Sequence, residues 1–555
     1  MNQRHFAFWP KRRPHEFPVP STSIAHNLAV SAARWPDHPA IVYYDTPISY
    51  ARLWREAEAL GGYLEHGAGV RRGDRVLLYM QNSPQFVIAY YAILRANAVV
   101  VPLNPMLVAE ELRTYIEDSG AQVAITGQEL AARLQGYAPE PLRRVVVAAY
   151  SDYIEHETDL ALPPAVGAPR AVFDAAGFIA WHDALSNTRP PGPLVTGGDD
   201  MALLPYTSGT TGRPKGCVHT HRSLQTTAWA TPMWSGGTGP GGRILSVLPF
   251  FHVTGMTGCM NAGLCNGATI VMMTRWDPAT ALTLIERYEC TSLTAISTMV
   301  VDLLSHPGYR AEALRSLVAL GGGGAPLPAA VGAELSERLG MNYMEGYGLT
   351  ETIAMTHANP PDRTKLQCLG VPTFGIDSRV IDPETLEELP QGETGEIIIA
   401  GSQVMREYWN QPEATNEAFV ERDGKRFLRT GDLGYVDDEG YFFLVDRVKR
   451  MINTGGFKVW PAEVETKLFS HPAVKEACVI ASLHPRRGEQ AKALIVLRDG
   501  AQATADDIIT WAREHMAAYK VPSEIAFVEA LPRGPTGKVQ WRALQEEEQR
   551  RFAPA

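Results

Sequence analysis

The stretch Tyr206-Thr207-Ser208-Gly209-Thr210-Thr211-Gly212-Arg213-Pro214-Lys215-Gly216 is the most informative part of this 555-residue chain. Its glycines allow backbone N–H groups to turn inward, its hydroxyls add donors, and Lys215 adds positive charge. Such a loop suits the oxygens of a polyphosphate. A flexible Gly/Ser/Thr turn is the alternative that composition leaves open. The segment is not a Walker A loop, because Lys215 is followed by glycine rather than by serine or threonine.

Strands and helices alternate ahead of this loop. Residues 76–80 form an apolar run, Ser83-Pro84 supplies an N-cap and a first-turn proline for a helix to about Ala96, and residues 98–101 form the next apolar run. The pattern continues with a helix at 110–118 and strands at 123–126, 244–248, 269–272, 317–320 and 396–400. This alternation predicts a mostly parallel sheet that helices cover on both faces.

The pattern changes after Asp446. A helix is expected from Pro461 and another at 506–516, with strands at 476–480, 493–497 and 525–528. These shorter elements predict a small α+β domain, and a chain of this length is expected to form more than one domain. The predicted fold class is therefore α/β, with a large N-terminal domain of layered α/β sheets over residues 1–446 and a small mobile C-terminal α+β domain over residues 447–555.

The composition is that of an ordinary globular protein, with 45% hydrophobic residues, 20% charged residues and a formal net charge of -10. The negative charge disfavours a nucleic-acid partner. The six cysteines show no metal-ligand spacing and predict reduced thiols in a cytoplasmic protein. The most apolar stretch, 86–103, contains Arg95 and Asn97, so it predicts a buried helix and strand rather than a transmembrane segment.

Further short motifs follow the loop in order. They read Gly321-Gly322-Gly323-Gly324-Ala325-Pro326, Glu345-Gly346-Tyr347-Gly348-Leu349-Thr350-Glu351, Arg429-Thr430-Gly431-Asp432, Asp446-Arg447-Val448-Lys449 and Pro535-Thr536-Gly537-Lys538. Together with the loop they resemble the signatures of the adenylate-forming superfamily, which includes acyl-CoA synthetases, firefly-luciferase-like enzymes and peptide-synthetase adenylation domains. Residues 216–221 are most similar to those of bacterial fatty-acyl-CoA ligases. The resemblance extends over nearly the whole chain.

The resemblance implies an ATP site and assigns nucleotide contacts to residues of these motifs. The predicted contacts are Thr207, Ser208, Gly209, Thr210, Thr211, Gly212, Lys215, Gly324, Ala325, Pro326, Gly346, Tyr347, Gly348, Thr350, Asp432, Arg447 and Lys538.

The side chains of this set suit the roles that the resemblance implies. A phenol ring such as that of Tyr347 can stack on adenine, and the carboxylate of Asp432 can accept from ribose hydroxyls. Glu351 is the predicted metal ligand, because a carboxylate oxygen suits Mg²⁺. Each of these residues also has a structural alternative. Tyr347 could be a core tyrosine in a turn, and Glu351 could be a charge at the N-terminus of a helix. The alternative for Asp432 is an aspartate in a turn, and the alternative for Arg447 is a surface ion pair.

The predicted catalytic residues are Lys538, Thr350, Glu351 and His252. By resemblance, Lys538 reaches the site during adenylation. Attack of a carboxylate on the α-phosphate brings two anions together, so a positioned ammonium stabilises that transition state. Lys449 occupies the family's hinge position, and a solvated charge in a basic run is the alternative for it.

The acyl pocket is predicted from the segment 250–256 and the glycine run. The resemblance places His252 beside the pocket, which Val253, Thr254, Met256, Gly321, Gly322 and Gly323 are expected to line. No carboxylate lies between Ile244 and Arg275, so a buried substrate ammonium would lack a partner. An amino-acid substrate is therefore disfavoured, and a neutral, apolar acyl tail is expected.

Coenzyme A is the expected acceptor, because no carrier domain follows Lys538 in the sequence. Gly455, Gly456 and Phe457 resemble the family's region near the pantetheine tunnel. Plant hydroxycinnamate ligases tend to carry lysine and glutamine where this chain has Asn453 and Lys458, which disfavours a phenylpropanoid ligase.

The sequence thus predicts an AMP-forming acyl-CoA ligase that uses ATP, Mg²⁺ and coenzyme A, with a medium- or long-chain fatty acid as substrate. An aryl-alkanoate ligase and an adenylate-forming enzyme that loads a carrier protein are the alternatives. The expected partners are small molecules, with no nucleic acid and no transmembrane segment. Peripheral membrane contact and the oligomeric state, including a homodimer, are left open.

Overall fold

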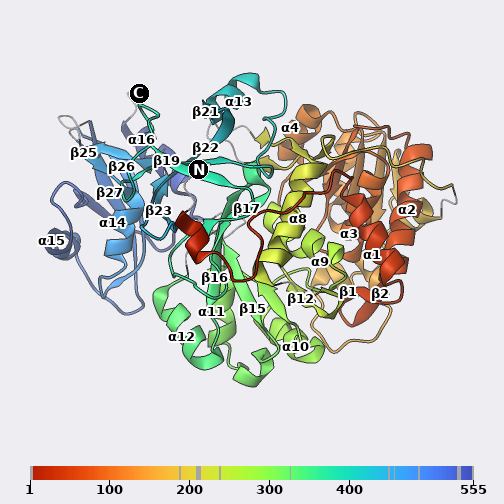
Figure 1. Cartoon of the computed structure of the whole chain (residues 1–555), viewed down its shortest axis with the longest axis horizontal. Helices are drawn as coiled ribbons and strands as arrows, with labels where there is room; N and C mark the ends of the chain where they lie inside the picture. Colours follow the sequence, from red (N-terminus) through yellow and green to blue (C-terminus); the bar gives the residue numbers. More distant parts are fainter. Residues whose placement is uncertain are drawn as a thin grey trace. The chain divides into compact units, whose positions relative to one another are not determined.

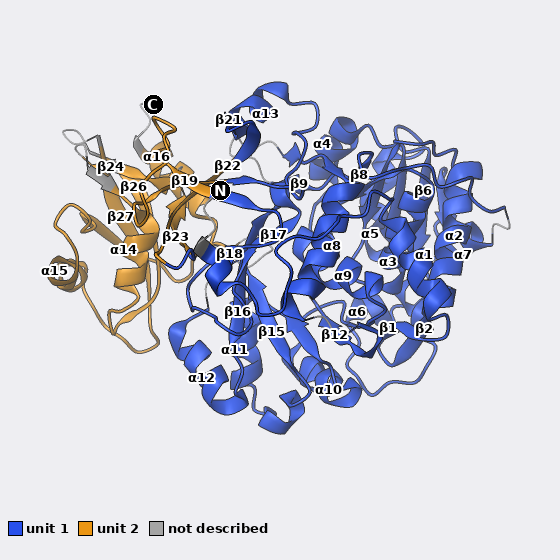
Figure 2. Ribbon diagram, in the orientation of Figure 1, with its two compact units in different colours: residues 1–378, 399–428, 439–441 blue, residues 379–398, 429–438, 442–555 orange. Residues whose placement is uncertain are grey.

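A computed structural model describes residues 4–186, 189–207, 214–236, 239–324, 327–447, 450–454, 457–484, 488–533 and 539–552. Figure 1 shows the order of its helices and strands along the chain. The chain forms two compact units (Figure 2): unit 1 holds residues 1–378, 399–428 and 439–441, and unit 2 holds residues 379–398, 429–438 and 442–555. Unit 2 thus takes in segments ahead of residue 446, and the boundary expected between residues 446 and 447 stays a prediction.

The first sheet of unit 1 has seven described strands and is mostly parallel. Its order is β11 (His219–Thr220), β8 (Met201–Leu203), β4 (Val99–Pro102), β3 (Arg75–Tyr79), β5 (Val123–Gly127), β6 (Arg144–Ala148) and β7 (Phe178–Ala180). Only the short edge strand β11 runs antiparallel to its neighbour among these described strands. Successive side chains of a strand point to opposite faces, so Val76 and Leu78 enter one hydrophobic core while Leu77 and Tyr79 enter another.

The second sheet of unit 1 has nine described strands. Its order is β18 (Val371–Pro372), β17 (Ala354–Ala358), β16 (Tyr343–Leu349), β15 (Ala319–Gly323), β14 (Ser292–Thr294), β12 (Arg243–Ser246), β13 (Thr269–Met272), β1 (Pro39–Tyr43) and β2 (Thr46–Ser49). The central pairs are parallel, and the pairs made by β2, β17 and β18 are antiparallel. The predicted mostly parallel, layered α/β architecture is confirmed.

Helix α3 (Pro84–Arg95) shows why the most apolar stretch of the chain is not a membrane span. Ser83 Oγ accepts a hydrogen bond from Phe86 N at 3.1 Å, which confirms the predicted N-cap. Residues 84–94 are all buried, and the helix packs against α2 (Tyr50–His66). A helix that is apolar on every side is expected at the centre of a large core. Among the described helices, none is long and apolar enough to cross a bilayer.

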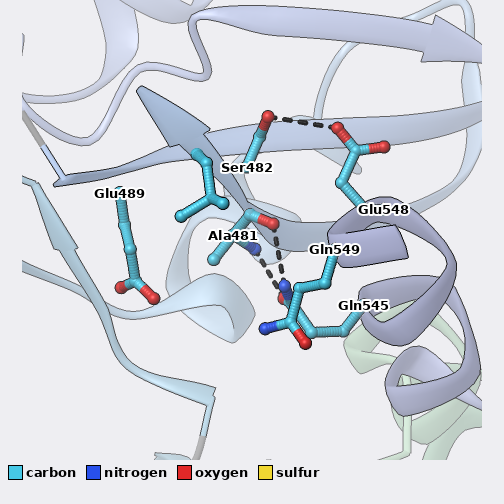
Figure 3. Close-up of a pocket in the computed structure, with 7 residues that line it drawn as sticks. Ala481, Ser482, Glu489, Gln545, Glu548 and Gln549 are labelled. Carbon is cyan, nitrogen blue, oxygen red and sulfur yellow. Dashed lines mark hydrogen bonds between the residues drawn. The ribbon is translucent and has the colours of Figure 1, made fainter. Parts of the chain in front are cut away.

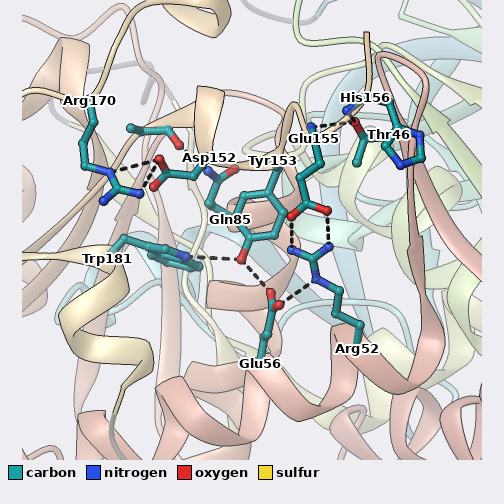
Figure 4. Close-up of polar contacts among 11 residues, drawn as sticks. Thr46, Arg52, Glu56, Gln85, Asp152, Tyr153, Glu155, His156, Arg170 and Trp181 are labelled. Carbon is teal, nitrogen blue, oxygen red and sulfur yellow. Dashed lines mark hydrogen bonds and ion pairs between the residues drawn. The ribbon is translucent and has the colours of Figure 1, made fainter.

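A polar network ties α2 to the chain that follows β6 (Figure 4). Arg52 Nε donates to Glu56 Oε1 at 2.8 Å, and its two Nη atoms reach the oxygens of Glu155 at 2.7 and 2.9 Å. Tyr153 OH donates to Glu56 Oε2 at 2.6 Å and accepts from Trp181 Nε1 at 3.3 Å. A bidentate arginine–carboxylate pair of this kind fixes geometry as well as adding energy.

Unit 2 contains a smaller sheet. Its described order is β25 (Phe457–Val459), β24 (Ile452–Thr454), β27 (Gly488–Leu497) and β26 (Val474–His484), and β28 (Glu524–Phe527) also pairs with β27. Helices α14 (Pro461–Leu468), α15 (Ala505–His515) and α16 (Trp541–Phe552) accompany it. The predicted small α+β fold is confirmed. In addition, β22 (Lys425–Val436) pairs antiparallel with β23 (Phe442–Arg447) from Asp432 to Val436.

Candidate active site

The Gly/Ser/Thr segment starts and ends in a short hairpin. Strands β9 (Tyr206–Thr207) and β10 (Lys215–Gly216) pair antiparallel, with Thr207 opposite Lys215 and Tyr206 opposite Gly216. Tyr206 OH donates to Asp118 Oδ2 at 2.6 Å and so fixes the first strand. The predicted phosphate contacts Ser208, Gly209, Thr210, Thr211 and Gly212 lie outside the described residues. Thr207 and Lys215 are thus held face to face at the base of this segment.

Glu351 lies close to this hairpin through Tyr408. The phenol of Tyr408 donates to Glu351 Oε1 at 2.9 Å, and Lys215 Nζ lies 4.9 Å from the centre of the Tyr408 ring. Burial, and then the neighbouring Glu351 carboxylate, raise the pKa of the Tyr408 phenol, so it stays a donor. One aromatic ring therefore contacts both the predicted metal ligand and the predicted phosphate-binding lysine.

Backbone pairing brings these distant segments together. Residues 216–218 run beside residues 406–409: Trp409 N donates to Gly216 O, Val218 N to Glu407 O, and Arg406 N to Val218 O, at 2.7 to 2.9 Å. Cys217 is fully buried at this junction. Burial raises the pKa of its thiol, with Glu351 raising it further and Lys215 opposing. Cys217 is therefore a neutral packing residue here.

Thr350 and Glu351 open a short 3-10 helix, Thr350–Thr352, directly after β16. His219 fixes the first residue, because its Nε2 lies 2.7 Å from Thr350 O in a bond that the neutral ring can donate. Burial lowers the pKa of His219 to about 4, which keeps the ring neutral near pH 7. Met405 N donates to Glu351 O at 2.7 Å. The segment is thus anchored from two other parts of unit 1.

The glycines of β15 are required by close contacts of the sheet itself. A Cβ atom at Gly322 would lie 2.0 Å from Ala295 O and 2.5 Å from the Tyr343 hydroxyl oxygen. At Gly321 it would lie 2.6 Å from Met344 O, and at Gly323 it would lie 2.3 Å from Gly346 O. These distances account for the glycines through backbone approach, and their predicted place on the wall of an acyl pocket stays a prediction. The next residue, Gly324, has φ +88°, whereas Ala325 and Pro326 lie outside the described residues.

Strand β16 carries the predicted adenine-side residues. Gly346 lies opposite Gly323, and Tyr347 lies opposite His357 on β17, with the two ring centroids 5.6 Å apart at 62°. The pairing of β16 with β17 is irregular between Tyr347 and Gly348. A Cβ atom at Gly348 would lie 1.7 Å from Ala354 O. Burial lowers the pKa of His357 to about 3, so an uncharged ring packs against Tyr347.

Glu345 begins one of the sequence motifs, and its structural role is not predicted by the sequence. Its side chain is buried, and its two carboxylate oxygens accept from Leu327 N at 2.7 Å and from Cys368 N at 2.8 Å. Burial raises the pKa of this carboxyl, and the backbone donors oppose that shift. Glu345 therefore holds the chain just after the glycine run in place. The signal in the sequence that could have indicated this role is the acidic residue directly before Gly346.

Asp432 and Arg447 form an ion pair within unit 2. They lie opposite each other on β22 and β23, and Arg447 Nε is 2.9 Å from Asp432 Oδ1. The Asp432 side chain is 2% exposed and that of Arg447 is 51% exposed. Glu396 supports the part of β22 just ahead of Asp432, because it accepts from Gly431 N at 3.0 Å and pairs with Arg429. The sequence does not predict this role for Glu396, because the residue lies in an apolar strand, β20 (Gly395–Ala400).

The segment predicted beside the acyl pocket contains an unexpected helix. Thr254–Asn261 forms a π-helix, a rare form that is frequent at functional sites. His252 is exposed, Thr254 is half-buried, and Val253 and Met256 are buried in the core of unit 1. Thr257 Oγ1 donates to Val253 O at 2.5 Å and lies 3.4 Å from Ile353 O, so the π-helix contacts the chain just after Glu351. The assignment of these residues to an acyl pocket stays a prediction.

Several predicted residues lie outside the described part of the chain. These are Lys538, Lys449, Gly455 and Gly456, and Phe457 is described only as the first residue of β25. Asp446, beside the predicted hinge, accepts from Arg447 N and from Ala462 N, each at 2.7 Å.

The donor set around Glu351 fits a magnesium ion that is bound mainly by substrate. Within the described residues, no group of three or more His, Cys, Asp or Glu side chains lies together as a metal cage. Glu351 nevertheless offers a carboxylate, with one oxygen already oriented by Tyr408. Mg²⁺ is commonly held by one or two carboxylates, water and substrate phosphates rather than by an all-protein cage.

Two family models and several known proteins match nearly the whole of this chain. The model of the AMP-binding enzyme family matches residues 28–409, and that of the AMP-binding enzyme C-terminal domain matches residues 463–538. The chain is 34% identical over 551 residues to a long-chain-fatty-acid–CoA ligase of Bacillus subtilis strain 168, covering 98% of this chain and 97% of that protein.

Two further relatives extend the comparison. A feruloyl-CoA synthase of an Amycolatopsis species is 36% identical over 528 residues, covering 94% of this chain and 98% of that protein. The crystal structure of ATP-bound MatB from Rhodopseudomonas palustris superposes with a TM-score of 0.82 at 28% identity, covering 95% of this chain and 100% of that one.

Proposed function

This chain belongs to the AMP-binding enzyme family and is an ATP-dependent, AMP-forming acyl-CoA ligase, and we propose that its acid substrate is a medium- or long-chain fatty acid. The observation that carries the proposed site is the Lys215–Tyr408–Glu351 contact, which puts a cation and a carboxylate at the base of the Gly/Ser/Thr segment. This is the pair of charges that an ATP polyphosphate with its metal ion requires.

The proposed reaction has two steps. The substrate carboxylate attacks the α-phosphorus of ATP, the bond to the β-phosphate oxygen breaks, and pyrophosphate leaves. The thiol of coenzyme A then loses its proton and attacks the acyl carbonyl, and AMP leaves as the thioester forms. Each step gathers negative charge, so positioned cations and N–H donors are expected to supply most of the stabilisation.

We assign roles in these steps to the residues of the motifs. Lys215 and the loop from Thr207 to Gly212 bind the polyphosphate, and Tyr347 stacks on adenine. Arg447 contacts the ribose or phosphate side, and Asp432 binds the ribose. The buried Asp432 carboxylate, oriented by its 2.9 Å ion pair, supports the last assignment. Thr350 would donate a hydrogen bond to a phosphate. Glu351 would hold Mg²⁺, whose positive charge would neutralise that of the phosphates.

Lys538 is proposed to act on the α-phosphate during adenylation, and the region of Gly455, Gly456 and Phe457 to admit coenzyme A. His252, Val253, Thr254, Met256 and the Gly321–Gly323 run are proposed to line the acyl pocket. The absence of carboxylates from residues 244–275 of the sequence supports an apolar tail there.

An aryl-alkanoate or hydroxycinnamate is the second candidate substrate. The 36% identity to a feruloyl-CoA synthase favours it, because that value is higher than the 34% identity to the fatty-acid ligase of Bacillus subtilis. A substrate panel separates the two. Fatty acids of increasing length, ferulate and a neutral amino acid would each be incubated with ATP, Mg²⁺ and coenzyme A, and AMP release would be measured.

We expect the highest kcat/KM for AMP release with a medium- or long-chain fatty acid, and no AMP release with the amino acid. A higher kcat/KM for ferulate than for every fatty acid would overturn the fatty-acid assignment in favour of the aryl one. Glu351→Gln protein serves as the control, because its AMP release is expected to fall with all acids alike.

A further inference from the structure

The outer edge of β26 is covered by side chains rather than by another strand. Among the described strands, β26 ends the order of its sheet, so the N–H and C=O groups on its outer side need other partners. Residues two apart present these groups to the same edge of a strand. Val479 and Ala481 are such a pair, and side chains satisfy both.

Val479 is bonded by the chain that follows the predicted hinge. Its N–H donates to Glu465 Oε1 at 2.7 Å, and its carbonyl accepts from Arg450 Nη2 at 3.1 Å. Arg450 and Glu465 also pair with each other. The Arg450 guanidinium lies 5.4 Å from the ring centre of Trp541, the first residue of α16.

Ala481 is bonded by α16 itself (Figure 3). The side chain of Gln545 accepts from Ala481 N at 2.8 Å and donates to Ala481 O at 2.9 Å, as a neighbouring strand would. Gln545 lies one turn into the helix that begins three residues after Lys538. The amide therefore fixes the start of α16 against β26.

The same strand also supports the chain on the other side of Lys538. Arg533 and Val539 pair as an isolated antiparallel bridge, and Gln540 N donates to Pro532 O at 2.7 Å. Arg533 Nη2 lies 2.7 Å from Glu476 Oε2 on β26. The residues on both sides of the segment 534–538 are thus fastened to one strand.

We propose that Gln545 is a positioning residue for Lys538: by binding Ala481 it holds α16, which begins three residues after the lysine, on the strand edge that also binds Arg450. The inference rests on the proposed function, in which Lys538 acts in adenylation. A displacement of about 1 Å at a reacting group can lower the rate up to a hundredfold. A side chain that fixes the helix next to the lysine is therefore expected to affect the rate of adenylation.

The helix has a second attachment, which makes the proposal testable without unfolding it. Lys492 Nζ lies 2.9 Å from both carboxylate oxygens of Glu548. Ser482 Oγ donates to Glu548 Oε1 at 3.1 Å, as Figure 3 shows. Val539, Trp541 and Leu544 also pack on an apolar cluster that includes Cys478 and Ile480. The variant Gln545→Met keeps the length of the side chain and removes both hydrogen bonds.

The test measures the two half-reactions separately in the full-length protein. Gln545→Met is expected to lower the rate of pyrophosphate release at saturating ATP and acid by about tenfold. It should leave thioester formation from supplied acyl-adenylate within about twofold of wild type. Gln549→Met is the matched control, because Gln549 is an exposed residue one turn further along α16, and it should behave as wild type in both assays.

The double variant Lys538→Ala/Gln545→Met decides whether Gln545 acts through the lysine. If it does, the double variant adenylates at the rate of Lys538→Ala alone. A further loss in the double variant, equal losses in both half-reactions, or wild-type adenylation by Gln545→Met would each overturn the inference. Wild-type adenylation by Lys538→Ala would instead refute the proposed role of the lysine, and the inference with it.

Discussion

Glu351 is prepared for its proposed role by a residue 57 positions away in sequence. Tyr408 donates to one of its carboxylate oxygens at 2.9 Å, which orients the group and leaves its other lone pairs available. The ring of Tyr408 also lies under Lys215 Nζ. A lysine over an aromatic face is attracted by the ring quadrupole. Tyr408 therefore organises both charges.

Replacing Tyr408 by phenylalanine tests this arrangement. The ring under Lys215 stays, and the bond to Glu351 is lost. A hydrogen bond to a charged group contributes about 1.5–3 kcal/mol, so we expect kcat/KM for Mg-ATP to fall at least about tenfold and the Mg²⁺ concentration for half-maximal rate to rise. Steady-state kinetics at varied Mg²⁺ measure both. An unchanged Mg²⁺ dependence in Tyr408→Phe would show that the phenol does not orient a metal ligand.

His219 makes stability depend on pH. Burial lowers its folded-state pKa to about 4, below the ordinary value near 6.5. Between these values the unfolded chain binds a proton that the folded protein does not. The free energy of unfolding should therefore decrease as the pH falls from about 6.5 to about 4, by about 1–3 kcal/mol for this residue.

The variant His219→Gln isolates that contribution, since its amide N–H can still donate to Thr350 O. We expect its unfolding free energy to be less sensitive to pH between about 4 and 6.5 than that of wild type. Urea denaturation at several pH values gives the slopes. Equal slopes for the two proteins would mean that His219 is not held neutral by burial.

The glycine run of β15 is required by the packing of the sheet, whether or not it also contacts a ligand. Strand β15 lies between β14 and β16, and the missing side chain at Gly322 allows the carbonyl of Ala295 to approach. Overpacking of a well-packed site costs about 1–3 kcal/mol, and more where backbone atoms cannot move.

Gly322→Ala is therefore expected to lower the free energy of unfolding by about 3 kcal/mol, because its Cβ would lie 2.0 Å from Ala295 O. Gly136→Ala is the control, since a Cβ there meets nothing within 4 Å and φ is not positive. That variant should be neutral or slightly stabilising. Chemical denaturation compares them. A Gly322→Ala protein as stable as Gly136→Ala would contradict the role of backbone approach.

Much of this architecture follows from local signals in the sequence. Ser83-Pro84 predicts the start of α3, and the apolar runs predict the parallel strands β3, β4 and β5. The π-helix Thr254–Asn261 was not predicted, because its i→i+5 bonds depend on packing around Thr257 and Ile353 rather than on a local pattern. The motifs named Lys215 and Glu351, whereas Tyr408 emerged only from the pairing of residues 216–218 with 406–409.

At the scale of the whole molecule, one enzyme has to perform two reactions with different geometries. We propose that a turn about Lys449 brings Lys538 to the α-phosphate for adenylation and withdraws it for the thiol step, as hinge motions do in other enzymes. Asp446 accepts from Ala462 N across this position, so the turn is expected to break that bond.

Two substitutions should separate the half-reactions. Lys538→Ala is expected to slow pyrophosphate release by about a hundredfold or more, the usual cost of one transition-state contact, and to spare thioester formation from supplied acyl-adenylate. Lys449→Pro stiffens the proposed hinge and should do the reverse. Circular dichroism checks that both variants fold. Equal losses of both half-reactions in each folded variant would refute the two-pose mechanism.

The proposed reaction requires an acyl-adenylate to form before coenzyme A reacts, and a single-turnover measurement can detect that intermediate. Protein in excess would be mixed with ATP labelled in the adenine, Mg²⁺ and a fatty acid, first without coenzyme A. We expect pyrophosphate and protein-bound acyl-adenylate to form together, and added coenzyme A to convert the adenylate to acyl-CoA and AMP in equal amounts. Release of ADP, or acyl-CoA formation without a labelled acyl-adenylate, would contradict the proposed reaction.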